Sequence, residues 1–149
     1  MIRVVLSAVL LGATPAWAAG TIPQTPIPQD TTDQRYANDL DGGDKHKRLF
    51  AARVLLRRTH EAARIGGRST EDIRVMEARQ RLADFDNLVA PKCVRLLKTT
   101  NVSRPCAKIL GLLETQAAIA PLRELEASAE AFCTRRAARW ALRRIEGSP

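Results

Sequence analysis

The chain has 149 residues and few of the side chains that build reactive or metal-binding centres. Three cysteines and two histidines are too few for a metal site rich in those ligands, so we expect no metal and no cofactor. Aromatic residues make up only 4% of the composition, which leaves little material for stacking against nucleic-acid bases. After residue 18 no apolar run approaches the ~20 residues of a membrane span, so no transmembrane segment is expected there.

Positive charge, in contrast, is abundant. The chain carries 24 Lys and Arg residues against 16 Asp and Glu residues, which gives a formal net charge of +8. Hydrophobic residues make up 45% and charged residues 27%, a balance that is typical of one modest folded domain.

Residues 1–18 have the layout of a secretory signal peptide. Arg3 gives a cationic start, residues 4–11 form a short apolar run, and Ala16 and Ala18 are the small residues that a signal peptidase reads. No cysteine follows the run, which argues against a lipoprotein anchor. We therefore expect a bacterial protein exported to the periplasm or beyond, where disulfide bonds persist.

The rest of the chain divides into a leader and a helical domain. Proline-rich composition predicts a disordered leader over residues 19–33. From residue 34 to residue 146 Ala, Leu and Arg dominate and no stretch alternates like a strand, which predicts an all-α domain. Seven helices are expected, over residues 34–41, 45–65, 70–84, 88–98, 103–114, 117–127 and 130–146.

Glycine pairs and capping side chains mark the breaks between these helices. The pair at 42–43 ends the first helix, and Asp44 is placed to cap the next one. The pair at 66–67 ends the long second helix. Ser69 and Ser103 are the predicted N-caps of the third and fifth helices.

Two segments that lie 86 positions apart are nearly identical. Residues 51–58 (AARVLLRR) and residues 137–144 (AARWALRR) share six of their eight residues. A looser third copy lies between them, with residues 110–114 matching residues 142–146 at a separation of 32. A short and a long helix that recur at such an interval predict a solenoid.

The repeated helices resemble the short HEAT-like repeats that are also found in phycobilisome lyases. The resemblance covers residues 107–146 best and residues 34–64 less well, and it implies a short α-solenoid of about three helical hairpins. The first two copies are 54 residues apart, so the array is irregular there, and an irregular helical bundle stays an alternative. Chromophore attachment is not carried over, because an exported protein would not meet that substrate. The residues that carry the resemblance are Ala118, Ile119, Ala120, Pro121, Leu122, Leu125 and residues 137–142.

A comparison of the copies predicts which helix forms the core. Ala107 and Gly111 of the middle copy fall where the last copy has Arg139 and Arg143. The middle helix is therefore apolar nearly all round and should be buried on several sides. The outer copies keep arginines on one face, which should be exposed.

The cysteines suggest one covalent link. Cys93 and Cys106 lie symmetrically about a turn, and we predict a disulfide between them, worth roughly 3 kcal/mol. Cys133 is then unpaired and expected to be buried near Trp140. The alternative is that all three are small buried hydrophobic residues.

Five basic side chains recur at helical spacing within residues 45–65, and the steps of 7, 4, 3 and 4 place them on one stripe. The stripe predicts a ridge for an anionic partner, with histidines that gain charge as the pH falls, although an ordinary solvated face is the alternative. Export and the lack of aromatic residues among them argue against nucleic acid. The candidate binding residues are His46, Arg53, Arg57, His60 and Arg64, together with Arg139 and Arg143.

No catalytic motif accompanies the stripe. His60-Glu61 lacks the second histidine of a zinc-binding helix, and the chain has neither a phosphate loop nor a nucleophile elbow. We therefore predict a non-enzymatic adaptor or scaffold that binds another protein of the bacterial envelope. The alternative is a charge-driven binder of anionic envelope polymers or lipid headgroups, and sensitivity to salt separates the two.

Overall fold

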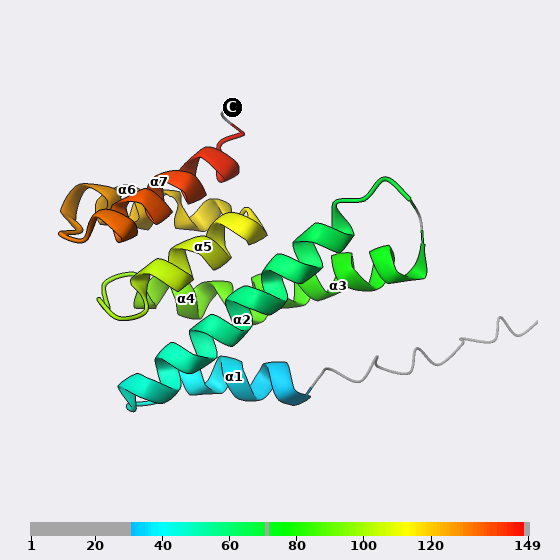
Figure 1. The fold of residues 1–149 in the computed structure, drawn as a ribbon, viewed down its shortest axis with the longest axis horizontal. Helices are drawn as coiled ribbons and strands as arrows, with labels where there is room; N and C mark the ends of the chain where they lie inside the picture. Colours follow the sequence, from blue (N-terminus) through cyan, green and yellow to red (C-terminus); the bar gives the residue numbers. More distant parts are fainter. Residues whose placement is uncertain (1–30, 71, 148–149) are drawn as a thin grey trace, which may run out of the picture.

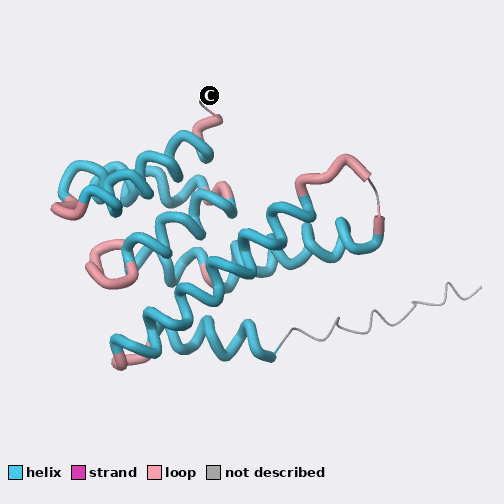
Figure 2. The backbone as a smooth tube through the Cα atoms, viewed as in Figure 1, coloured by secondary structure: helices cyan, strands magenta, loops and turns pink. Residues whose placement is uncertain are grey.

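The computed structural model describes residues 31–70 and 72–147, and every regular element in those residues is a helix (Figure 2). The predicted signal peptide and most of the predicted leader lie outside the described residues. None of the described helices combines the length and the apolar character that crossing a membrane requires. The elements are α1 (Thr31–Asp41), α2 (Lys45–Gly66), α3 (Ile73–Leu88), α4 (Ala90–Leu96), α5 (Ser103–Leu113), the 3-10 helix η1 (Gln116–Ala118), α6 (Ile119–Ser128) and α7 (Phe132–Ile145).

The all-helical prediction is confirmed over the described residues, but α1 begins three residues before its predicted start. The reason is Asp33, which lies in the first turn of α1 and is buried. Its carboxylate pairs with Arg58 of α2 and lies 3.8 Å from Arg81 of α3. An acid also suits the positive end of the helix dipole. The last residues of the predicted leader therefore belong to the folded part of the chain.

Of the three predicted N-caps, Asp44 is confirmed. Its carboxylate accepts hydrogen bonds from the backbone N–H groups of Lys47, at 3.2 Å, and His46, at 2.8 Å. These two bonds stabilise the charged form and lower the pKa of Asp44. Together with the glycines before it, Asp44 sets the abrupt turn between α1 and α2.

The predictions for Ser69 and Ser103 are wrong. The third helix begins at Ile73, and its cap is Asp72, whose carboxylate accepts from the N–H of Arg74 at 3.4 Å. Ser103 is the first residue of α5 and not its cap. Its hydroxyl donates back to the carbonyl of Thr100, at 3.2 Å, and so does not cap the helix.

The predicted break between the third and fourth helices is a bend. Val89 alone separates α3 from α4 and has helical backbone angles. Its N–H donates to the carbonyl of Phe85, and its own carbonyl accepts from Cys93. Pro91, which has no N–H, then interrupts the helical hydrogen bonding and accounts for the change of direction. The residues that make the interval between the first two copies irregular thus form α3, which continues through this bend into α4.

The helices form two layers. In Figure 1, α2, α5 and α7 lie side by side toward the viewer, and α1, α4 and α6 each pack against the helix of that layer that follows them. The second half of α2 and the helix α3 form an arm at one side (Figure 1). Since α5 contacts α2, α3, α4 and α7, it occupies the middle of the molecule.

The predicted burial of the middle helix is confirmed. Eight of the eleven residues of α5 are buried, including Ile109 and Leu110, which are fully inaccessible. Gly111 faces α7 so closely that a Cβ atom built on it would lie 2.7 Å from the Cα atom of Ala141 and 2.8 Å from the ring of Trp140. Glycine is therefore required at this position because the two backbones approach each other.

The predicted environment of Cys133 is wrong. Cys133 is exposed, on the side of α7 that also carries Trp140, which is itself 40% exposed. The helical spacing of the two residues was correct, but no further helix of the described chain covers that side of α7.

Candidate binding surface

Five of the seven candidate binding residues form one exposed line along α2, which we call the α2 ridge: His46, Arg53, Arg57, His60 and Arg64. The helix runs without a break from Lys45 to Gly66, so the ridge extends over about 27 Å at 1.5 Å per residue. The opposite side of α2, which includes Ala51, Leu55 and Ala62, is buried in the core. The structure thus brings these five predicted residues together on a rigid support.

The side chains of the α2 ridge have no partner within residues 31–70 and 72–147, where they make neither hydrogen bonds nor ion pairs. The nearest acid in sequence is Glu61, which is exposed and forms no ion pair with Arg57 or Arg64 in the part of the chain described. Most other acids that form ion pairs do so far from the ridge, for example Glu114 with Arg144 and Glu126 with Arg139. The ridge is therefore a line of positive charge that the fold does not neutralise.

The other two candidates, Arg139 and Arg143, do not join this line. They lie on α7, and α5 stands between α7 and α2 (Figure 1). Arg139 is already engaged, because its Nε donates to a carboxylate oxygen of Glu126 at 2.6 Å. Arg143 is exposed and points away from the core. We therefore restrict the candidate binding surface to α2 and its immediate neighbours.

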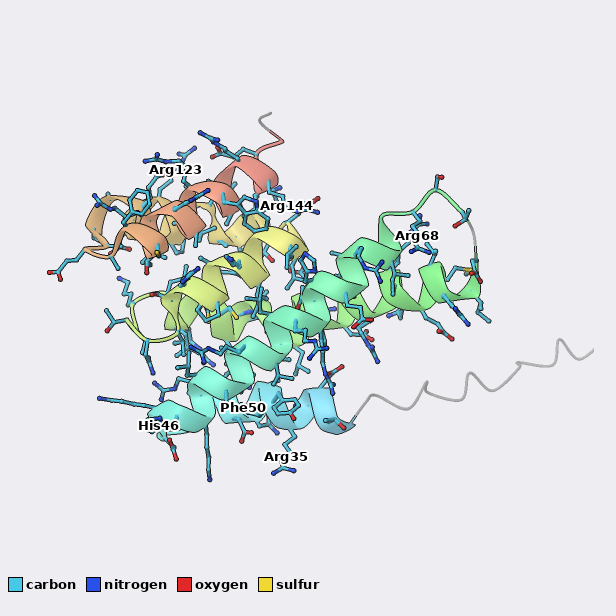
Figure 3. The ribbon with its side chains drawn as sticks, in the orientation of Figure 1. Arg35, His46, Phe50, Arg68, Arg123 and Arg144 are labelled. Atoms are coloured by element: carbon cyan, nitrogen blue, oxygen red, sulfur yellow. The ribbon has the colours of Figure 1, made fainter. Side chains whose placement is uncertain are left out.

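A cleft that sequence reasoning missed lies beside the N-terminal half of the ridge. The α1–α2 cleft has a volume of about 260 Å³ and is lined by Arg35, Tyr36, Asp39, Lys47 and Phe50. Figure 3 shows Arg35 and Phe50 close together on the α1–α2 hairpin, with His46 nearer the turn between the two helices. The exposed phenylalanine at helical spacing from the ridge was the available signal, but its partners on α1 could not be inferred from local sequence.

The aromatic side of this cleft is held in place by an ion pair. The rings of Tyr36 and Phe50 are 6.1 Å apart between centroids and tilted by 59°. The guanidinium of Arg58 lies 5.5 Å from the centroid of the Tyr36 ring, a favourable cation–π distance. The same guanidinium pairs with buried Asp33. Tyr36 is thereby fixed, whereas Phe50 remains 60% exposed.

Cys93 and Cys106 are both buried, facing each other from α4 and α5. Both thiols are free in this structure, and a disulfide between them stays a prediction. The hydrogen bond with Cys106, followed by burial, raises the pKa of the Cys93 thiol well above its usual range. A nucleophilic cysteine needs the opposite shift, so this pair is suited to a structural role.

A second cleft, of about 740 Å³, lies along α3, α4 and the segment after α5. Its polar groups are already partnered: Asp86 accepts from the hydroxyl of Thr115 at 2.6 Å, while Lys92 and Arg95 both pair with Asp41. No three His, Cys, Asp or Glu side chains of the described chain gather as a metal site would require. We therefore find no converging set of groups for a reaction in this cleft.

Comparison with protein-family models, with curated proteins and with solved structures finds no match to this chain. The geometry of the α2 ridge and of the α1–α2 cleft is thus the basis for any functional conclusion.

Proposed function

We propose that this protein is a non-enzymatic, protein-binding adaptor of the bacterial envelope, built from three HEAT-like helical hairpins. The pairs α1–α2, α4–α5 and α6–α7 support the hairpin reading, because the helices of each pair pack against each other. The near-identical segments lie on α2 and α7, the second helices of the outer pairs, as a repeat would require. The signal-peptide layout of residues 1–18 supports export to the periplasm or beyond.

The observation that carries the proposal is the unpaired state of the α2 ridge. Three arginines and two histidines are exposed on one rigid helix, and no acid of the described chain pairs with them. Such a surface attracts a partner of opposite charge and increases the rate of association. The most suitable partner is another envelope protein with an acidic surface.

The test is capture from an envelope extract with the tagged mature protein at low and at high ionic strength. The variant Arg53→Ala/Arg57→Ala/Arg64→Ala should lose the captured protein, while its melting temperature stays that of the wild type, because these side chains have no partner to lose. The matched control is Arg74→Ala/Arg135→Ala/Arg136→Ala, which removes the same charge from α3 and α7 and should still bind. Equal capture by both variants would refute a role for the ridge.

A second candidate function is charge-driven binding of anionic envelope polymers or lipid headgroups. It is favoured by the ridge itself, whose five side chains are all cations or imidazoles, with the exposed Glu61 beside them. Binding by charge alone should collapse as the ionic strength rises, whereas a packed protein interface should largely survive. Vesicles that contain anionic lipid and a soluble anionic polysaccharide, each titrated at two salt concentrations, separate this candidate from the adaptor.

A further inference from the structure

The α1–α2 cleft and the α2 ridge form one continuous surface, because Phe50 borders both. Phe50 precedes Arg53 by three residues and Arg57 by seven, so its ring lies on the same side of α2 as these two arginines. Phe50 is 60% exposed and lines the cleft, so its ring is accessible to a partner. The ridge thus has an apolar residue at one end and three spaced arginines along its length.

The two aromatic residues of the cleft, Tyr36 and Phe50, offer a surface for one apolar side chain. Tyr36 supplies a wall whose position is fixed by the cation–π contact with Arg58 and by the ion pair from Arg58 to Asp33. Phe50 supplies the second aromatic surface, tilted by 59° to the first. Because one wall is already ordered, an incoming side chain loses little of its binding energy to ordering the cleft.

The charges around the cleft indicate which sign of charge the occupant should carry. Two cations, Arg35 and Lys47, line it against one acid, Asp39. The side chains of Arg35 and Lys47 form no ion pair within the described ranges, and Arg35 extends outward from α1 in Figure 3. A partner that places carboxylates beside these groups and along the ridge is complementary to the whole surface.

We infer that the α1–α2 cleft is the anchor pocket for an apolar side chain of an acidic, extended segment of the partner protein, whose carboxylates follow the ridge. This inference rests on the proposed adaptor function. The rise from Phe50 to Arg64 is about 21 Å, which six or seven extended residues span. Arg53 and Arg57 are separated by about 6 Å along the helix, close to the roughly 6.7 Å between alternate residues of an extended chain.

A membrane surface fits the same features less well. A helix that binds in the plane of a membrane inserts a broad apolar face into the headgroup region. On the exposed side of α2, Phe50 is the only large apolar side chain that could insert. The apolar face of the helix, with Ala51 and Leu55, is buried in the core. A single anchor beside a line of cations matches a peptide with one apolar residue and several acids.

The inference is tested with two blocked synthetic octapeptides, one with phenylalanine followed by seven glutamates and one with alanine in place of the phenylalanine. Affinities for the full mature chain are measured by fluorescence anisotropy at low salt. The phenylalanine peptide should bind roughly tenfold more tightly than the alanine peptide, the effect of one well-placed hot-spot side chain. In Phe50→Ala this preference should disappear, while the affinity for the alanine peptide stays within about twofold, because that peptide has no anchor.

The outcomes separate this inference from the proposal on which it rests. If neither peptide binds the wild type, or if binding survives Arg53→Ala/Arg57→Ala/Arg64→Ala, the ridge is not the binding surface and both ideas fail. If both peptides bind the wild type equally and only the ridge variant loses them, the ridge is confirmed and the anchor pocket is refuted. Anionic vesicles that bind with equal dependence on Phe50, in the absence of peptide preference, would also refute the peptide anchor. Arg35→Gln/Lys47→Gln is the second variant, and it should weaken both peptides while the melting temperature is unchanged.

Discussion

Related helices of this molecule carry different residues at equivalent positions. The outer helix α2 has Arg53 and Arg57 where the middle helix α5 has Ala107 and Gly111. In α2 these positions face solvent, and in α5 they are buried, with Gly111 directly beneath α7. The difference shows that one amphipathic pattern has two outcomes: without its arginines the helix forms the core, and with them it keeps an exposed basic face.

A second comparison, between α2 and α7, shows where the arginines of the two outer helices differ in their ion pairing. The paired arginines at 57–58 and 143–144 behave alike, because the second member of each pair forms an ion pair, with Asp33 or Glu114. The preceding arginines differ. Arg139 is neutralised by Glu126 of α6, whereas α1 offers Arg53 no acid. An acid on α6 therefore neutralises a position of α7 whose counterpart in α2 stays unpaired.

Leu110→Ala is expected to have the largest effect on this comparison. Leu110 is fully buried in the middle of α5, and removal of its side chain leaves a cavity that the packed neighbours cannot close. We expect a loss of about 2–5 kcal/mol in the free energy of unfolding, measured by urea denaturation. Arg57→Ala on α2 should leave the denaturation midpoint unchanged, and a similar loss in both variants would contradict the division into core and surface.

A Cys93–Cys106 disulfide would link α4 to α5, and its reduction should destabilise the protein. If the exported protein carries this bond, its mass rises by two hydrogens on reduction, and its unfolding free energy falls by roughly 3 kcal/mol. Cys133, which is exposed, should react with a thiol reagent in the native state, whereas the two buried cysteines should not. Three free thiols in the exported protein would show that α4 and α5 are held by packing alone.

The helices were predictable because their apolar spacing and their glycine breaks are local. The middle helix was also predictable, since Ala107 and Gly111 stand where the last copy has arginines. The exposure of Cys133 was not, because it depends on whether a further helix covers α7. The bend at Val89 was not predicted either, because the predicted third helix ends at residue 84, whereas α3 continues to Leu88 and meets α4 at Val89.

The candidate surface was predictable only in part. The five ridge residues follow from helical spacing, and the structure places them on one exposed face. The α1–α2 cleft depends on Tyr36, whose position is set by Arg58 and Asp33, residues 25 positions apart. No local sequence pattern predicts such a contact. The pairing of Arg139 with Glu126 likewise depends on how α6 packs against α7.

Gly111→Ala should sharpen the distinction between covered and open helix faces. The added Cβ atom would lie 2.7 Å from the Cα atom of Ala141, so α5 and α7 must move apart. Overpacking of this kind costs about 1–3 kcal/mol in the free energy of unfolding. The control is Gly43→Ala, where a Cβ atom meets nothing within 4 Å. An unchanged melting temperature for Gly111→Ala would show that the two helices are not in close contact.

The smallest effect is expected at the exposed ion pairs that join Asp41 of α1 to α4. The hydrogen bond from Lys92 and the charges of Lys92 and Arg95 lower the pKa of Asp41 below its ordinary value of 3.8, although partial burial opposes the shift. A depressed folded-state pKa contributes stability that is complete above the ordinary value and is lost as the pH falls through the lower one. Asp41 is exposed, and exposed pairs contribute at most about 1 kcal/mol, so Asp41→Asn should lower stability at neutral pH by no more than that amount and should show a flatter acid limb that meets the wild-type curve at low pH. Thermal melts from pH 7 to pH 2 measure this, and an acid limb as steep as that of the wild type would show that the contact between α1 and α4 depends on packing, as the contact between α5 and α7 does.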